Sequence, residues 1–451
     1  MTKNNPAISK GVDWSLVGLY LLLVLIGIFA IFATTYNEER DVNIVSSFFS
    51  FRTDYSRQFF FFLIAGVLGI FILLTDSKFF PATANLWYAV GIVFMLLVFP
   101  LHSDIKGTKS IIKFGGAIQF QPADFCKLCV CLALAKYLSL PDLDFSKTKS
   151  HLIAAGITLL PAVLSIMQSE TGLALVYFSF FIVMYREGLP ATILVIGFSL
   201  AALVVATLLV DKNILAIILS AIAAFVVFLM WRQIKRDRML LIGIILIWAV
   251  CVGIQRFGVP LLFQKVFQPY QVERIFSTIG KEVPEEYMDI QERRKLEVEK
   301  TRSKGADDYN VRQSKIAIGS GGVAGKGILK STQTRYDFVP EQRTDFIFCT
   351  IGEGFGFVGT SLVLAIYLLL LFRIVAVAER QRSVFSRCYA YGVASVFFFH
   401  IVINICMTIG LAPVIGIPLP FISYGGTSLL TFTILLFILI RLDADRQMVL
   451  R

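Results

Sequence analysis

Apolar segments of about 20 residues recur along the chain, and this feature limits the fold more than any other. Residues 14–33 read WSLVGLYLLLVLIGIFAIFA and hold no charged side chain. As a helix, such a segment is long enough to cross the hydrocarbon core of a bilayer. Hydrophobic residues make up 57% of the chain and charged residues 16%, whereas soluble domains are about half apolar and a quarter charged. The sequence therefore predicts an all-α polytopic integral membrane protein.

We count about twelve such segments. They cover residues 14–33, 57–75, 84–101, 121–139, 151–167, 171–186, 189–210, 213–231, 239–256, 345–372, 387–412 and 420–441. Only the sequence QSE separates the fifth segment from the sixth, so these two could form one bent helix. We therefore expect about 10 to 12 transmembrane helices.

Lysine and arginine residues in the short connections indicate the orientation. They occur near both ends of the chain and in residues 232–238 and 373–387. With twelve spans these connections share one side, which the positive-inside rule makes cytoplasmic, together with both termini. The net charge of +11 is spread over these short connections. This pattern suits anionic lipid and argues against a nucleic-acid partner.

The one long connection, residues 257–344, is then extracytoplasmic. We interpret residues 1–451 as a single membrane domain with this loop inserted. Its charged arm at about 281–304 mixes acids and bases without an apolar stripe, as in a solvated helix. The glycine-rich run 319–327 predicts a flexible loop whose backbone can approach a ligand closely.

Ionisable side chains at membrane depth are costly, so they are candidates for function. Lys127, Glu170 and Asp345 each lie near the external end of a predicted span. They either converge on one membrane face or pair separately with other groups. Asp345 follows Thr344 at the expected start of a helix, where Thr344 could act as N-cap and the helix dipole would stabilise the acid. The same acid could serve as a general base.

Glycine and proline residues interrupt the last two spans between Asn404 and Leu430. Irregular backbone at membrane depth often lines substrate sites in transporters, so a transporter is an alternative. No metal site is expected, because the cysteines at 126–131 lack a second group of ligands.

Three long motifs resemble the SEDS family, whose members include RodA, FtsW and SpoVE. They are QSKIAIGSGGVAGKG, FVPEQRTDFIFCTIGEGFGFVG and GLAPVIGIPLPFISYGGTS, and FQPADFCK is similar to a further family element. The match runs from about Trp14 to the C-terminus, and STQTRYDFVPEQRTDF looks more like RodA than FtsW. The resemblance implies a peptidoglycan glycosyltransferase that polymerises lipid II on the outer face of the bacterial inner membrane. An FtsW-like division paralogue and a lipid-precursor flippase are the alternatives.

The resemblance also assigns residues. The family's essential acid falls on Asp345, its lysine on Lys127, a second acid on Glu170 and an arginine on Arg274. Lys315, Arg343 and Glu341 of the matching motifs complete the candidate substrate-binding set. Some positions depart from the family: Glu170 replaces an aspartate, and Ser110 and Ile111 stand where the family has Arg-Trp. Any role of that arginine would then need Lys109 or Lys113.

The implied reaction joins the 4-hydroxyl of an acceptor sugar to C1 of a donor glycan. Asp345 would take the proton, and Lys127, Arg343 and Arg274 would stabilise the leaving lipid pyrophosphate. No cofactor is required by the sequence, although Mg²⁺ or Mn²⁺ could accompany the pyrophosphate. The implied partners are lipid II, a class B penicillin-binding protein and other membrane proteins of the elongation complex.

Overall fold

The structure, a computed structural model, describes most of the chain. Outside the described residues are 1–10, 37–46, 102, 106–107, 115–117, 169, 266–271, 273–275, 277–305, 328, 413 and 447–451. Residues 1–189 with 310–451 form one compact unit, and residues 190–309 form a second.

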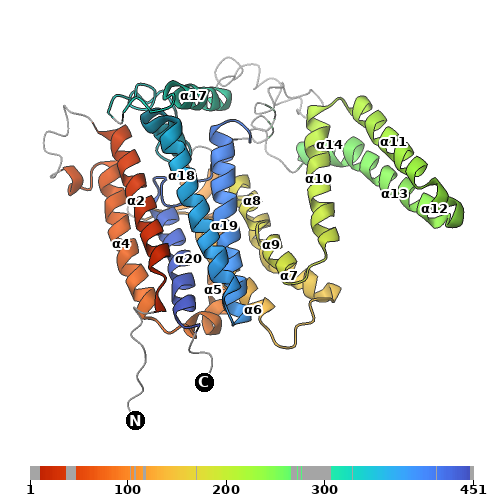
Figure 1. Cartoon of the computed structure of the whole chain (residues 1–451), viewed down its shortest axis with the longest axis horizontal. Helices are drawn as coiled ribbons and strands as arrows, with labels where there is room; N and C mark the ends of the chain where they lie inside the picture. Colours follow the sequence, from red (N-terminus) through yellow and green to blue (C-terminus); the bar gives the residue numbers. More distant parts are fainter. Residues whose placement is uncertain are drawn as a thin grey trace, which may run out of the picture. The chain divides into compact units, whose positions relative to one another are not determined.

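The first unit is a helical bundle (Figure 1). Its helices are α2 (Trp14–Thr35), α4 (Asp54–Leu74), α5 (Phe79–Leu101), α6 (Pro122–Leu138), α7 (Thr148–Met167), α8 (Thr171–Tyr177), α9 (Phe180–Arg186), α18 (Ile347–Glu379), α19 (Val384–Thr408) and α20 (Gly426–Ala444). Helix α17 (Ala306–Ser320) precedes α18. The second unit contains α10 (Ala191–Leu209), α11 (Lys212–Leu229), α12 (Trp231–Arg236), α13 (Met239–Gly253), the π-helical turn η1 (Ile254–Gly258) and α14 (Val259–Lys265).

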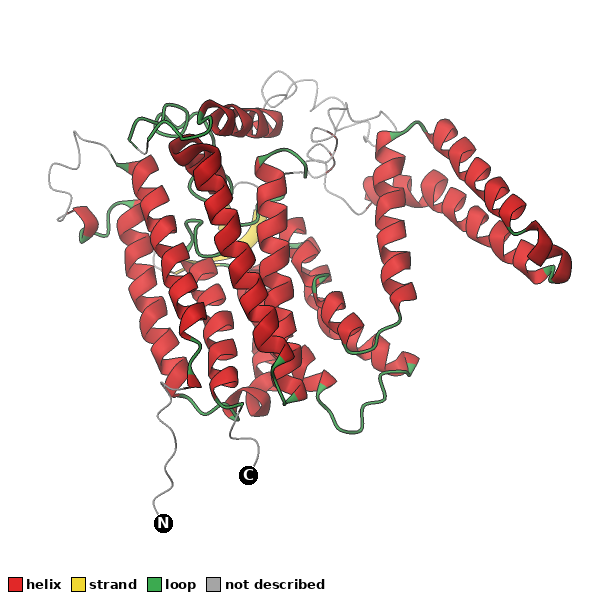
Figure 2. Ribbon diagram, viewed as in Figure 1, coloured by secondary structure: helices red, strands yellow, loops and turns green. Residues whose placement is uncertain are grey.

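The predicted fold class is confirmed: among the described residues, ten helices are long and apolar enough to cross a membrane. Each predicted segment contains helix. The 171–186 segment is divided into α8 and α9, and residues 168–170 separate α7 from α8. Helix α6 spans 17 residues and is buried along most of its length. The sequence did not predict the small antiparallel sheet of β1 (Ser103–Ile105), β2 (Thr108–Phe114) and β3 (Ile118–Phe120), which follows α5 (Figure 2).

The two units differ in how deeply their helices are buried. In α20, 72% of the apolar 18-residue stretch is buried, because α4, α6 and α19 pack around this helix. In α11, and in the continuous span Met239–Gln264 formed by α13, η1 and α14, only 6% of the apolar stretch is buried. Apolar side chains on these second-unit helices therefore face outward, as expected of helices that contact lipid.

Helix α18 is broken at Gly356, where φ is +64°, and the glycine-rich run packs against this break. The amide of Lys326 donates to the Glu353 carbonyl at 3.0 Å, and Phe357 donates to the Gly322 carbonyl at 2.9 Å. A Cβ added to Gly321 would lie 2.0 Å from the Gly352 oxygen. The close backbone approach predicted for this run is therefore made to α18, within the protein itself.

Candidate active site

The candidate site is organised by residues 409–425, called here the 409–425 loop, which connects α19 to α20. Its backbone is left-handed at Gly410, Gly416 and Phe421, and Gly410 ends α19 two residues after Thr408. Side chains from neighbouring helices satisfy its carbonyls. Tyr367 donates to the Pro420 oxygen at 2.6 Å, and Asn404 donates to the Ile417 oxygen at 2.7 Å. These bonds hold irregular backbone inside a membrane bundle.

Asp345 lies in a turn held against this loop. Asn404 Nδ2 donates to the backbone oxygen of Asp345 at 2.8 Å. The amide of Tyr424 donates to the Arg343 oxygen at 2.8 Å, and Ser423 Oγ donates to the Thr344 oxygen at 2.5 Å. The turn is thus fixed through its main chain, while the Asp345 side chain stays half-buried. Its Oδ2 lies 3.5 Å from the position that a Cβ on Gly416 would take.

The predicted helix start at Asp345 is wrong by two residues. Helix α18 begins at Ile347, and its N-cap is Phe346, without a side-chain cap. Thr344 does not cap the helix, because it lies two residues before the N-cap position, and its hydroxyl donates to Glu341 Oε2 at 3.0 Å. The turn closes instead through amides that donate to the Glu341 oxygen, and Glu341 itself is left-handed, with φ of +55°. Such a conformation is uncommon for a residue with a side chain and often marks a functional turn.

Arg343 connects the turn to the first turn of α4. Its Nη1 lies 2.8 Å from Asp54 Oδ2, and its Nη2 lies 3.2 Å from Asp337 Oδ1. The Arg343 side chain is 31% exposed. Both carboxylates fix the orientation of the guanidinium while leaving part of it open to solvent.

Lys127 lies in the interior of the bundle, where its side chain is 1% exposed. Its Nζ is 2.7 Å from Asp124 Oδ1 and 3.0 Å from His400 Nε2, and it lies 4.1 Å from the centre of the Phe432 ring. Ser428 also donates to Asp124. A buried cation needs such a set of partners to offset its desolvation. His400 Nδ1 is 3.2 Å from the Pro418 oxygen, which connects this cluster to the 409–425 loop.

Glu170 precedes α8 as its N-cap residue and accepts a hydrogen bond from Ser110 Oγ at 2.5 Å. Ser110 is one of the two residues at which the resemblance implied an Arg-Trp pair. In the next turn, a Cβ on Gly172 would lie 2.6 Å from the Ile415 oxygen. The start of α8 therefore also lies against the 409–425 loop.

Lys315 is exposed on α17, and its ammonium lies against the same loop. A Cβ on Gly410 would be 2.4 Å from Lys315 Nζ. Ser314 Oγ donates to the Thr408 oxygen at 2.9 Å and anchors α17 to the end of α19. Arg274 and the arm at 281–304 lie outside the described residues.

Three of the side chains that hold the site were missed by the sequence reasoning. His400 was detectable as an ionisable side chain inside an apolar span, and Asn404 as a polar one a turn later. Asp54 begins α4 and had only its place at the predicted external end of a span as a signal. No group of three or more His, Cys, Asp or Glu side chains within the described ranges could hold a metal ion.

Together, the fold and the site define a polytopic helical membrane protein with a half-exposed acid at one end of its bundle. A profile of the FtsW/RodA/SpoVE family, described as cell cycle proteins, matches residues 13–240 and 200–448. The chain belongs to this family.

Two relatives with named activities match this chain over most of their length and over most of its own. Peptidoglycan glycosyltransferase RodA of Treponema pallidum (strain Nichols) is 29% identical over 462 residues, covering 96% of this chain and 97% of that protein. Peptidoglycan glycosyltransferase MrdB of Escherichia coli (strain K12) is 27% identical over 386 residues, 84% of each chain. A chain from a solved peptidoglycan synthase complex, described as coordinating polymerization and crosslinking, superposes with a TM-score of 0.62 at 22% identity, covering 96% of this chain and 98% of that one. At 22% identity, this structural match supports the similarity of fold alone.

Proposed function

We propose that this peptidoglycan glycosyltransferase polymerises lipid II with Asp345 as the general base. The observation that carries the proposal is the turn at Arg343–Asp345. Three hydrogen bonds fix the main chain of this turn, and the Asp345 side chain stays half-buried. A base needs a defined position and access to its substrate, and this arrangement supplies both.

In the proposed step, the acceptor's 4-hydroxyl oxygen attacks C1 of the donor glycan. The hydroxyl proton passes to the Asp345 carboxylate, and the bond from C1 to the pyrophosphate oxygen breaks. The electron pair of that bond leaves with the lipid pyrophosphate. Because the main chain that carries the carboxylate is fixed, this step needs little reorganisation of the backbone.

Arg343 is the first candidate for holding the pyrophosphate. Asp54 and Asp337 orient its guanidinium, which keeps 31% of its surface exposed and can bind phosphate oxygens in a fork. Lys315 adds a flexible cation beside Gly410. Because Lys127 is almost fully buried, we assign it a positioning role through His400 and the 409–425 loop. Glu170 would position the loop from the side of α8, and Glu341 would shape the turn.

A divalent cation, if the reaction uses one, would arrive with the substrate. Pyrophosphate oxygens are preferred ligands of Mg²⁺, which keeps several waters and takes few protein carboxylates. Arg274 stays a proposed contact of the substrate from the external loop at 257–344.

We place this multi-pass protein in the bacterial inner membrane, with both termini in the cytoplasm and the Asp345 turn outside. The start of α2 and the end of α20 lie at the same end of the bundle (Figure 1). Arg373, Arg380 and Arg446 gather there, which supports a cytoplasmic assignment for that end. The proposed partner is a class B penicillin-binding protein, and the proposed process is cell elongation.

A lipid-precursor flippase is the second candidate. The buried cluster of Lys127, Asp124 and His400 favours it, because ionisable groups inside a bundle can line a transport path.

Reconstitution separates the candidates. The purified chain and its transpeptidase partner are placed in liposomes with lipid II, and the glycan products are resolved on a gel. A polymerase yields a ladder of glycan strands, and Asp345→Asn removes it. A flippase moves labelled lipid II between leaflets without a ladder. A ladder of full intensity from Asp345→Asn would overturn the assignment of the base.

A further inference from the structure

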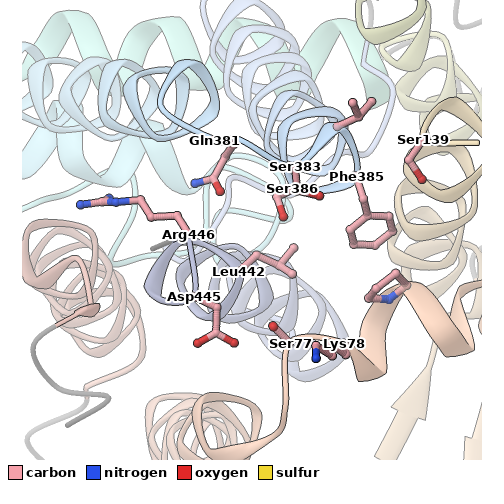
Figure 3. A pocket seen from close by; sticks show the side chains of 12 residues that line it. Ser77, Lys78, Ser139, Gln381, Ser383, Phe385, Ser386, Leu442, Asp445 and Arg446 are labelled. Carbon is pink, nitrogen blue, oxygen red and sulfur yellow. The ribbon is translucent and has the colours of Figure 1, made fainter. Parts of the chain in front are cut away.

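A second polar site lies at the other end of α18 from the Asp345 turn. With 33 residues, α18 is about 50 Å long, so this site is remote from the proposed chemistry. It is a cavity of about 340 Å³. The lining residues come from four connected regions: Ser77, Lys78 and Pro81 around the start of α5; Ser139 after α6; Gln381, Ser383, Val384, Phe385 and Ser386 at the start of α19; and Leu442, Asp445 and Arg446 at the end of α20 (Figure 3).

The N-terminus of α19 opens into this cavity. Ser383 is the N-cap residue, with extended backbone, and its side chain makes no capping hydrogen bond. The four consecutive residues 383–386 all line the cavity. The first amides of a helix lack partners within the helix and carry a partial positive charge, so they attract anions.

Ser386 supplies a second, independent indication of a ligand. Its side chain is only 7% exposed, and its hydroxyl has no hydrogen-bond partner among the residues that the structure describes. The side chain points toward the cavity (Figure 3). The residue is packed in protein, whereas its hydroxyl oxygen is reachable from the cavity, so the hydroxyl can donate to a ligand bound there.

The charges around the cavity favour an anion over a cation. The Asp445 carboxylate is neutralised by Arg441, whose Nη1 lies 2.6 Å from Asp445 Oδ1. Arg446 is paired with Asp443 at 2.9 Å. Lys78 is exposed at the rim, and its ammonium makes no ion pair within the described ranges, while the neighbouring Asp76 carboxylate accepts from the Lys78 amide at 3.0 Å.

We propose that this cavity binds a phosphate group, carried by a lipid headgroup or present as free phosphate. The helix amides and the Ser386 hydroxyl would donate to the phosphate oxygens, and Lys78 would add a charge-assisted contact. Phe385, Leu442 and Pro81 provide apolar surface for the carbon atoms next to the phosphate. The volume is at the small end of the range of ligand pockets, which suits a headgroup.

The test compares wild type, Lys78→Gln, Ser386→Ala and Ser386→Asp. An aspartate in the first turn of α19 suits the helix dipole, so Ser386→Asp is expected to fold while repelling an anion. Lys147→Gln is the matched control, because Lys147 is also an exposed lysine, on the connection that follows α6, and pairs with Asp144 at 3.4 Å. Melting temperature without ligand checks folding in each case.

Two arms distinguish the sources of phosphate. In one arm, native mass spectrometry counts phosphatidylglycerol retained after extraction from nanodiscs, with phosphatidylcholine nanodiscs for comparison. In the other, the melting temperature is followed in maltoside micelles as inorganic phosphate replaces chloride at constant ionic strength. A bound phosphatidylglycerol indicates a headgroup site, and a shift with inorganic phosphate indicates a site for the free ion.

In whichever arm wild type binds, we expect Lys78→Gln to weaken binding about tenfold and Ser386→Asp to abolish it. Ser386→Ala should weaken it by a smaller factor, and Lys147→Gln should match wild type. The proposal is overturned if wild type binds in neither arm. It is also overturned if Lys78→Gln and Ser386→Asp bind as well as Lys147→Gln.

Discussion

Two acids eight positions apart, Asp345 and Glu353, stand in opposite environments. Glu353 is fully buried and accepts from the amides of Thr332, Gln333 and Thr334, each at 2.9 Å, as well as from Lys326 Nζ. Asp345 is held through its backbone, and its side chain is half-buried. Glu353 therefore fastens a loop to α18, whereas Asp345 lies partly exposed in a turn that is held by its main chain. Both acids lie near the start of α18. Their positions in the sequence alone therefore do not show which acid supports the structure and which is the candidate for chemistry.

Replacing Asp345 should give the largest effect on activity. Asp345→Asn keeps the size of the side chain and removes the base, so we expect glycan synthesis to fall by about 10²–10⁴-fold. The melting temperature should stay near that of wild type, because the variant keeps the main-chain hydrogen bonds that fix the turn. The measurement is the rate of lipid II consumption by the reconstituted complex. If the variant loses stability and activity together, Asp345 has a structural role like that of Glu353.

Glu353→Ala should show the reverse pattern. It leaves three amides, of which that of Thr334 is buried, and a partly exposed ammonium without their acceptor, so we expect a loss of about 1.5–3 kcal/mol in unfolding free energy. Activity per folded molecule should be close to that of wild type. Thermal unfolding and the polymerisation rate, measured on the same monodisperse sample, check this. A stable but inactive Glu353→Ala would mean that this acid also acts in the chemistry.

The Lys127 cluster tests whether a buried charge can still serve the reaction. Lys127→Met alone should cost about 3–5 kcal/mol, because Asp124 is left buried without its cation, and Lys127→Met with Asp124→Leu should recover much of that stability. If Lys127 positions the loop through His400, the double variant is stable and still slow. If the double variant recovers activity together with stability, the cluster contributes only to stability and has no role in the reaction.

Asp13 is a third buried acid, held by arginine side chains instead of backbone amides. Burial alone would raise the pKa of the Asp13 carboxyl, but hydrogen bonds from Arg373 and Arg380 outweigh it and hold the pKa below its ordinary value. Its stabilising contribution is therefore complete above the unfolded-state pKa and is lost as pH falls through the folded-state pKa.

We accordingly expect Asp13→Asn to lower unfolding free energy by about 1.5–3 kcal/mol at neutral pH. The difference from wild type should shrink in acid as Asp13 becomes protonated. Melting curves from pH 7 downward measure this. A difference that stays constant over the whole range would show that the ion pairs contribute nothing.

The helices were predictable because apolar length alone defines them, as in α2, where 14–33 was expected and Trp14–Thr35 is observed. The Asp345 motif was also visible in the sequence. Its surroundings were not, because Asp54 is paired with a residue 289 positions away and His400 with one 273 positions away. Such partners are set by packing. The capping prediction for Thr344 failed because a turn closed on the Glu341 carbonyl precedes the helix and delays its start to Ile347.

The glycine-rich run 319–327 contacts α18 through the main chain of both segments. Its contacts join main chain to main chain, and a Cβ on Gly325 would lie 2.2 Å from the Gly354 oxygen. The side chains between these contacts take no part in them, and Val323 is 70% exposed. A substitution at position 323 would thus change the exposed surface of this run and leave its main-chain contacts with α18 in place. The two functions of the segment, presenting a surface and supporting the break in α18, are therefore separable by mutation.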